Sequence, residues 1–102
     1  MARTSRVVAE LQPEVEDVFE ESRTCEMSTL ARDGTPITWP TLPFWYSDEK
    51  RFTITTSIGL AQKALNVRRD QRVSLLFFNP TASGLEHPPA VLVQGDAEAL
   101  RR

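Results

Sequence analysis

The sequence is poor in the residues that build disulfides and metal sites. Among its 102 residues, only Cys25 is a cysteine and only His87 is a histidine. One cysteine excludes an intramolecular disulfide and a multi-cysteine zinc site, and one histidine excludes a paired-histidine metal motif. We therefore expect no metal ion and a reducing, cytoplasmic environment.

Long apolar runs and a surplus of positive charge are also missing. No run approaches the roughly 20 apolar residues of a membrane-spanning helix, and the first six residues are not followed by the apolar stretch of a signal peptide. The formal net charge of −2 gives none of the basic surplus with which proteins bind nucleic acid through bulk charge. We expect neither a membrane nor a nucleic acid as a partner. With 40% hydrophobic and 25% charged residues, the chain has the composition of one globular domain.

What the sequence does contain is a change of hydrophobic period. Apolar residues at helical spacing predict a short amphipathic helix over residues 13–22, and proline suits its first turn. The period then becomes two, and the segments expected to form strands are residues 25–31, 36–46, 52–57, 72–78 and 90–94. A second helix is expected over residues 60–69, with one apolar stripe made of Leu60, Ala61, Ala64, Leu65 and Val67.

Several of these segments carry further signals. Asp33-Gly34 predicts a hairpin turn after the first strand. Three prolines within residues 36–46 predict an edge, bulged or bent strand, because proline cannot donate to a ladder. The nearly continuous apolar run over residues 72–78 indicates burial on both faces. Gly95 is expected to end the last strand, and an irregular or helical tail is expected to follow from Ala97.

The order of these elements indicates a mainly β fold. One helix, a meander of three strands, a second helix and two more strands are typical of a small, partly open β-barrel with helices at its edges. An OB-like or an SH3-like barrel would give a similar order.

The chemically informative stretch lies where the third strand meets the second helix. Thr55, Thr56 and Ser57 are consecutive hydroxyl residues, and Lys63 follows one turn inside the helix. Unpaired N–H groups at a helix N-terminus attract anions, and hydroxyls and a lysine add donors and charge, so the stretch can hold a phosphate. The alternative is that Ser57 caps the helix, the threonines fit the strand and Lys63 is a surface lysine.

An ordered set of motifs resembles a known family. Residues 53–57, the helix through Lys63 and residues 69–78 follow one another without insertions, as in the FMN-binding split barrel of the pyridoxamine 5'-phosphate oxidase superfamily. Residues 91–98 resemble the next strand of that family, and residues 27–30 with Asp33-Gly34 resemble its first hairpin. The resemblance extends from about Glu14 to Leu100 and implies a split antiparallel β-barrel with flanking helices.

The resemblance also implies a cofactor site. In the family, the flavin phosphate is held by the end of the third strand and the following helix. The implied contacts are Thr55, Thr56, Ser57, Gln62 and Lys63, while Thr41 and Leu42 would lie against the isoalloxazine ring. The family site lies at the interface of a homodimer.

Some positions depart from the vitamin-oxidising members of the family. Gln62 stands where those members carry arginine, and Ala90 stands where they carry a glutamine that contacts the flavin. Their basic residues on the second strand are also missing from residues 38–44. These departures fit better the broad relatives that bind FMN or the deazaflavin coenzyme F420. We expect residues 1–102 to form one split-barrel domain without the C-terminal helix and closing strand usual in the family.

The resulting hypothesis is a homodimeric oxidoreductase that transfers a hydride or electrons between a flavin, FMN or deazaflavin, and a small substrate. The cofactor carries the redox chemistry, so no side chain is named as catalytic. A flavin-binding protein without enzymatic activity and a cofactor-free dimerising module are the alternatives.

Cys25 is expected to pack as a small apolar residue and His87 to lie in an exposed loop. The aromatic side chains suit either a flavin or the core; they are Trp39, Phe44 and Trp45.

Overall fold

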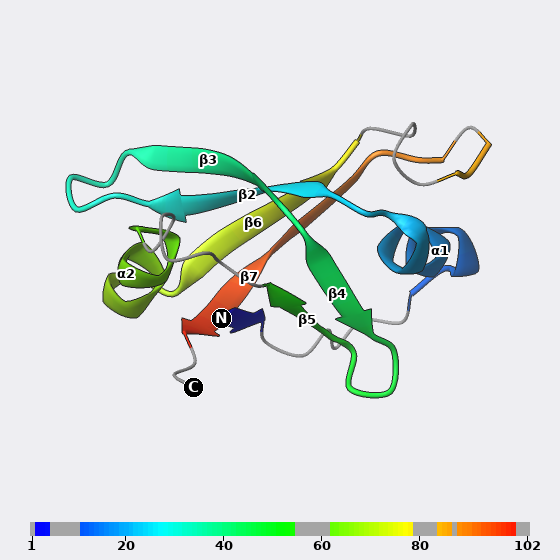
Figure 1. Cartoon of the computed structure of the whole chain (residues 1–102), viewed down its shortest axis with the longest axis horizontal. Coiled ribbons are helices and arrows are strands. Elements are labelled where there is room, and N and C mark those ends of the chain that lie inside the picture. The colour runs from blue at the N-terminus through cyan, green and yellow to red at the C-terminus, as the bar shows by residue number, and fades with distance from the viewer. Residues whose placement is uncertain (1, 5–10, 55–61, 79–83, 87, 100–102) are drawn as a thin grey trace.

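The computed structural model describes residues 2–4, 11–54, 62–78, 84–86 and 88–99. Over these residues the chain forms a strongly curled sheet with one helix at each end (Figure 1). The elements are β1 (Ala2–Thr4), α1 (Pro13–Glu21), β2 (Cys25–Leu30), β3 (Pro36–Thr41), β4 (Pro43–Tyr46), β5 (Arg51–Ile54), α2 (Gln62–Arg69), β6 (Arg72–Phe77) and β7 (Val91–Ala99).

The strands form one antiparallel sheet in the order β3-β2-β6-β7-β1-β5-β4. Its two edge strands, β3 and β4, are consecutive in the chain and are separated only by Leu42. A sheet whose opposite edges are joined by one residue must curl into a half-open barrel. The prolines Pro36, Pro40 and Pro43 all lie on these edge strands, so the edge and bend predicted for residues 36–46 are confirmed. The predicted mainly β split barrel is confirmed as well.

Two parts of the sheet differ from the sequence expectation, namely β1, which was not predicted, and the end of β7. The prediction of an irregular or helical tail from Ala97 is wrong, because β7 continues through Gly95 to Ala99. Its extension pairs with β1, in the register Ala2↔Ala99 to Thr4↔Ala97. Because β1 supplies ladder partners to both β7 and β5, the polar end of β7 becomes a strand that its own sequence does not predict.

The core lies between the inner face of the sheet and α1. Phe19 of α1 packs against Trp45, Phe52 and Phe77 with ring centroids 5.0, 4.9 and 5.3 Å apart. Such aromatic pairs contribute about 0.5–1.5 kcal/mol each beyond the area that they bury. The predicted helix at residues 13–22 is therefore confirmed over Pro13–Glu21, and its apolar face anchors it to the sheet.

The strand β6 is buried mainly on one face. Val73, Leu75 and Phe77 point into the core, whereas Ser74 and Leu76 between them are only half-buried. The prediction that this strand is buried on both faces is therefore wrong, because its outer side chains have no layer of the described chain packed fully over them. The hairpin predicted at Asp33-Gly34 is confirmed, with Gly34 at a φ of +88° that favours glycine.

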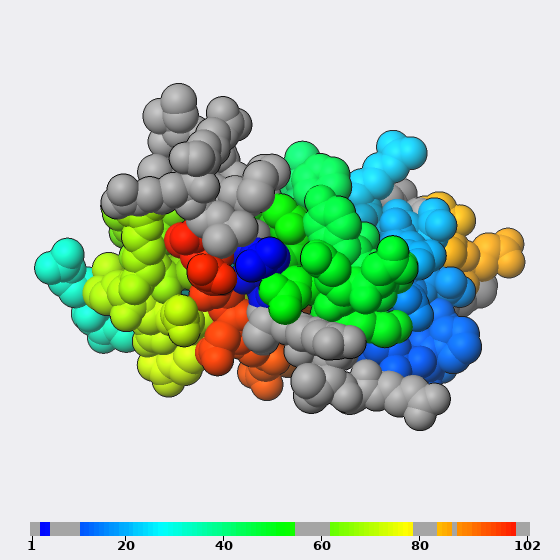
Figure 2. Space-filling model, turned by 90° about the horizontal axis from the view of Figure 1, so that it is seen from below, coloured from blue at the N-terminus to red at the C-terminus, as the bar shows by residue number. Residues whose placement is uncertain are grey.

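Space-filling Figure 2 shows α1 and α2 at opposite ends of the molecule, with β4 and the turn after it between them. In the part of the chain that the structure describes, no helix has the length and apolar character needed to cross a bilayer.

Candidate functional site

The face of α2 that meets the sheet is largely polar. Lys63, Asn66 and Val67 are the buried residues of this helix, whereas Leu65 is half-exposed. The predicted apolar stripe is therefore wrong at Leu65, whereas its member Val67 is buried as expected. Two further members, Leu60 and Ala61, lie outside the described residues. Polar groups can face a sheet only where the sheet supplies hydrogen-bond partners, and β2 and β3 supply them here.

Lys63 is the most unusual of these buried groups. Its side chain comes from the first turn of α2, and the residue is 4% exposed. The ammonium Nζ donates a hydrogen bond to Oγ1 of Thr41, the last residue of β3, at 3.2 Å. The alternative that Lys63 is a surface lysine is therefore wrong. Burial lowers the pKa of its ammonium, because a charged group loses hydration inside the protein.

Cys25 lies opposite Thr41 in the ladder of β2 and β3. Burial raises the pKa of its thiol to about 12, although the positive charge of Lys63 acts in the opposite direction. The thiol is therefore uncharged at neutral pH and cannot serve as the counterion of Lys63. Its burial confirms the expectation that Cys25 packs as a small apolar residue.

Asn66 organises the middle of α2. Its amide Nδ2 donates to Oγ1 of Thr29 at 3.0 Å, which ties the helix to β2. Its carbonyl Oδ1 accepts bonds from Gln62 Nε2 at 2.9 Å and from Arg69 Nη2 at 2.8 Å. Asn66 is a site residue that was not predicted from the sequence; its signal is the polar pair Lys63 and Asn66, three residues apart on one helix face.

A further donor lies on the inner face of β3. Trp39 is two residues before Thr41 and so points to the same face, and its indole Nε1 is buried without a hydrogen-bond partner among the described residues. Buried donors without an acceptor are rare in folded proteins. The indole Nε1 of Trp45 is also buried and has no partner in the described part of the chain, but it belongs to the aromatic core around Phe52.

The other predicted site residues are distributed around this helix. Gln62 is exposed at the start of α2. Leu42, which separates β3 from β4, is 52% exposed directly after Thr41. Ala90 is exposed ahead of β7. Thr55, Thr56 and Ser57 lie outside the described residues, as does His87. The structure thus brings Lys63 together with Thr41 and leaves the position of the hydroxyl run open.

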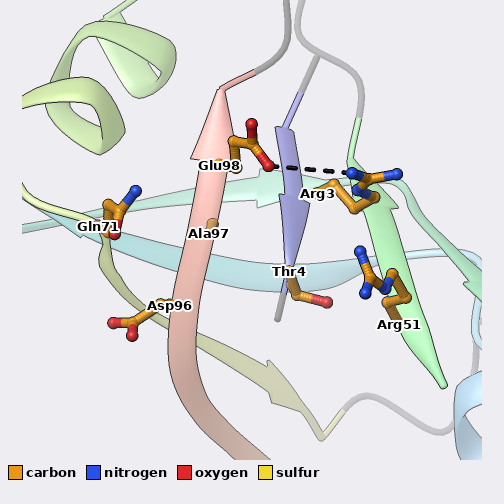
Figure 3. A pocket seen from close by; sticks show the side chains of 7 residues that line it. All are labelled: Arg3, Thr4, Arg51, Gln71, Asp96, Ala97 and Glu98. Carbon is orange, nitrogen blue, oxygen red and sulfur yellow. Dashed lines mark ion pairs between the residues drawn. The ribbon is translucent and has the colours of Figure 1, made fainter. Parts of the chain in front are cut away.

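A separate pocket lies around β1 (Figure 3). It has a volume of about 190 Å³, and its lining residues are Arg3, Thr4, Arg51, Gln71, Asp96, Ala97 and Glu98. Arg3 and Glu98 face each other across the ladder, with their charged groups 3.9 Å apart. Its volume is below the roughly 300–1,000 Å³ of most small-molecule sites, and its mixed charges favour no single class of ligand.

The fold and the polar contacts of α2 together define a split antiparallel barrel with a buried cation beside its bent edge strand. Comparison with known families identifies the family to which this architecture belongs. Residues 11–102 match the model of the pyridoxamine 5'-phosphate oxidase family, and the chain belongs to that family. The family is one of flavin-binding, oxidoreductase-like split barrels. Comparisons with curated proteins and with solved structures found no match.

The residues present fit the phosphate of a flavin in their chemistry. The ammonium of Lys63 has three N–H groups, of which one is used on a neutral hydroxyl. Among the described residues, no carboxylate pairs with it. The indole Nε1 of Trp39, on the same face of β3 as Thr41, is a further buried donor without a partner among the described residues. An oxyanion is the kind of group that would satisfy this set.

Proposed function

We propose that the protein is a flavin-dependent oxidoreductase that holds a phosphate-bearing flavin, FMN or a deazaflavin, at the Lys63 end of α2. The observation that carries this proposal is the buried ammonium of Lys63, whose one hydrogen-bond partner among the described residues is the neutral hydroxyl of Thr41. A buried charge without a counterion is costly. An anionic ligand offsets that cost, and family membership indicates which ligand class to test first.

Each residue has a defined role in this proposal. Lys63 supplies the full positive charge, and the hydroxyl of Thr41 orients its ammonium. Gln62, exposed at the start of α2, supplies an amide in place of a second charge. Thr55, Thr56 and Ser57 precede this helix and complete the phosphate contacts that the family resemblance implies. We assign no side-chain acid or base to the reaction.

The ring of the flavin is proposed to lie beside the bend of the edge strand. Leu42 offers an apolar side chain there that is about half-exposed, next to the buried Thr41. When bound, the flavin supplies the hydride or electron transfer. The chain orients the ring against the small substrate and limits the access of water to it.

A homodimer is part of the same proposal. Phe44 and Tyr46 are two residues apart and lie on the same outer face of β4, and each is about half-exposed. With Leu42 they form an apolar strip along an edge strand, which is the type of surface that a second copy can cover. The resemblance implies that the flavin lies at such an interface. We place this dimer in the cytoplasm.

Visible absorbance of the purified protein tests the cofactor assignment. The protein is titrated with FMN, with the deazaflavin and with riboflavin, which lacks the phosphate. We expect saturable binding of a phosphorylated cofactor and weaker binding of riboflavin. Failure of the folded protein to bind any of the three would overturn the proposal and favour a cofactor-free dimerising module.

Two lysine variants make the test specific. Lys63→Met keeps the shape of the side chain and removes its charge, so the preference for FMN over riboflavin should fall by roughly tenfold or more. Lys50→Met is the matched control, because Lys50 lies in the turn after β4 and pairs with Glu16 at 3.8 Å. Equal FMN affinity in Lys63→Met and the wild type would refute the role of Lys63. Turnover of a bound flavin with a reductant then separates an enzyme from a flavin-storage protein.

A further inference from the structure

A second polar hollow lies between α2 and the turn that joins β2 to β3. It has a volume of about 500 Å³, and the residues that line it are Arg32, Gln62, Leu65 and Arg69. Its volume lies within the range usual for small-molecule sites. In both views the β2–β3 hairpin, which carries Arg32, lies beside α2 (Figures 1 and 2). Among the described residues, the lining contains two guanidinium groups and no carboxylate.

Arg69 is held in place by neutral acceptors. Its Nη2 donates to the backbone carbonyl of Leu30 at 2.9 Å and to Oδ1 of Asn66 at 2.8 Å. These bonds fix the guanidinium at the end of β2 without cancelling its charge. A guanidinium that is already oriented loses less conformational entropy when it binds a ligand.

The carboxylates closest in sequence are engaged elsewhere. Asp70, next to Arg69, accepts bonds from Nε and Nη2 of Arg72 at 3.0 and 2.8 Å. Asp33, next to Arg32, accepts the backbone N–H of Thr35 at 3.0 Å. Among the described residues, neither Arg32 nor Arg69 forms an ion pair. Asp70 interacts with the charge of Arg69 only at longer range, so in the described part of the chain the two guanidinium groups keep their N–H donors free of a direct carboxylate partner.

The Arg32 end of the hollow lies at the opposite end of the β2–β3 ladder from the contact between Lys63 and Thr41. Thr41 pairs with Cys25 at one end of the β2–β3 ladder, and Pro36 pairs with Leu30 at the other, next to the turn with Arg32. Five residues of strand separate Thr41 from Pro36, which corresponds to about 17 Å. Arg32 is therefore far from Thr41 along the strands, although Gln62, which lines the hollow, is next to Lys63 in the chain.

We propose that this hollow is an oxyanion-binding site, in which Arg32 and Arg69 bind a phosphate or carboxylate group. The exposed side chain of Leu65 gives the apolar contact for the rest of a small organic anion. The oxyanion comes either from a substrate or second ligand, or from the flavin itself. This inference does not depend on flavin binding at Lys63.

Titration with inorganic phosphate and, separately, with acetate, followed by two-dimensional amide NMR, tests the site. We expect saturable shifts at Arg32, Gln62, Leu65 and Arg69, and tighter binding of the dianion. Arg32→Gln should weaken phosphate binding by roughly tenfold, because it removes one charge-assisted contact. Arg32 is preferred to Arg69 as the variant, because Arg69 also holds the end of β2.

Arg68→Gln is the matched control, since Arg68 is exposed on the same helix and does not line the hollow. An equal loss of phosphate binding in both variants would show general charge attraction and overturn the site, as would shifts without saturation. Competition identifies the source of the oxyanion. If FMN displaces phosphate and riboflavin does not, the flavin supplies it; if FMN and phosphate bind together, another ligand supplies it.

Discussion

The ammonium of Lys63 and the hydroxyl of Thr41 are joined by a hydrogen bond of 3.2 Å in the interior of the protein, between the first turn of α2 and the end of β3. This contact links the helix to the edge strand just before it bends at Leu42. It also places a positive charge where the neighbouring groups are neutral, namely Thr41 and the uncharged thiol of Cys25. The stability and the ligand binding of the protein both depend on this charge.

Removing the charge of Lys63 should stabilise the flavin-free protein. Replacing a buried charge by an apolar side chain of similar volume is often stabilising, and we expect Lys63→Met to raise the free energy of unfolding by about 1–2 kcal/mol at pH 7. Burial lowers the pKa of the folded-state ammonium below the unfolded value of about 10.4. The wild type therefore gains stability as the pH rises toward about 10, and loses it as the pH falls through the folded-state pKa.

Urea unfolding at several pH values between 7 and 10 measures this effect. The advantage of Lys63→Met should shrink as the pH rises, whereas Lys50→Met should follow the wild type at every pH. A Lys63→Met variant that is less stable than the wild type at pH 7 would contradict the prediction.

The thiol of Cys25 should be unreactive in the folded protein. With the thiol pKa raised to about 12 and the side chain buried, a disulfide reagent at pH 8 should modify less than a few per cent of the folded chains within minutes. The same reagent should react completely in denaturing urea. Rapid modification without urea would show that the β2–β3 ladder opens readily at this point.

The same thiol gives an alkaline prediction of opposite sign to that for Lys63. A pKa that is raised on folding contributes stability below the unfolded value of about 8.5, and this stability is lost as the pH rises from there to about 12. Cys25→Ala should therefore show a smaller loss of unfolding free energy between pH 8.5 and 10.5 than the wild type. Parallel pH profiles of the two proteins would refute this assignment.

Removing the amide of Asn66 should destabilise the contact between α2 and the sheet. Asn66→Ala leaves the hydroxyl of Thr29 and donors of Gln62 and Arg69 without their partner, and we expect a loss of about 2–3 kcal/mol. Gln62→Ala removes only one partly exposed bond and should cost less than about 1 kcal/mol. Chemical denaturation followed by circular dichroism compares the two, and equal losses would be the contrary result.

The hydroxyl of Thr4 should be important for the position of β1. It accepts the backbone N–H of Phe52 at 2.8 Å, in a buried contact between residues 48 positions apart. Thr4→Val keeps the side-chain shape and leaves this N–H unpaired, so we expect a loss of about 1–3 kcal/mol. Thr4→Ser, which keeps the hydroxyl, should lose less. A Thr4→Val variant as stable as the wild type would show that the bond is dispensable.

The parts of the fold that the sequence predicts are those with a local signal. The period of two, the turn at Asp33-Gly34 and the prolines of the edge strands identify most of the sheet. The three residues of β1 carry no such signal, and their pairing depends on β5 and β7, which are distant in the chain. The same holds for the polar end of β7, which is a strand because β6 pairs with Gly95 and Asp96 and β1 pairs with Ala97 to Ala99.

In the site, too, the residues with a local sequence signal were predicted, whereas the contacts between distant residues were not. Lys63 stands out in the sequence because a lysine follows a run of hydroxyl residues at the start of a helix. Its burial could not be predicted, because it depends on Thr41, which is 22 positions away and on the inner face of another strand. Asn66 was missed for the same reason, since its partner Thr29 is 37 positions away. Helix periodicity favoured Leu65 as a buried residue because it weighs apolar character and ignores hydrogen bonds.

The position of β1 between β7 and β5 has a consequence for the order of folding. Its partners in β7 are more than 90 residues away in sequence, so this pairing has a very high contact order and is expected to form late and slowly. During synthesis, β2, β3, β4 and β5 can pair before residues 91–99 leave the ribosome, whereas the centre of the sheet cannot. Until then, the nascent chain presents unpaired strand edges, and chaperones that shield such edges should increase its yield.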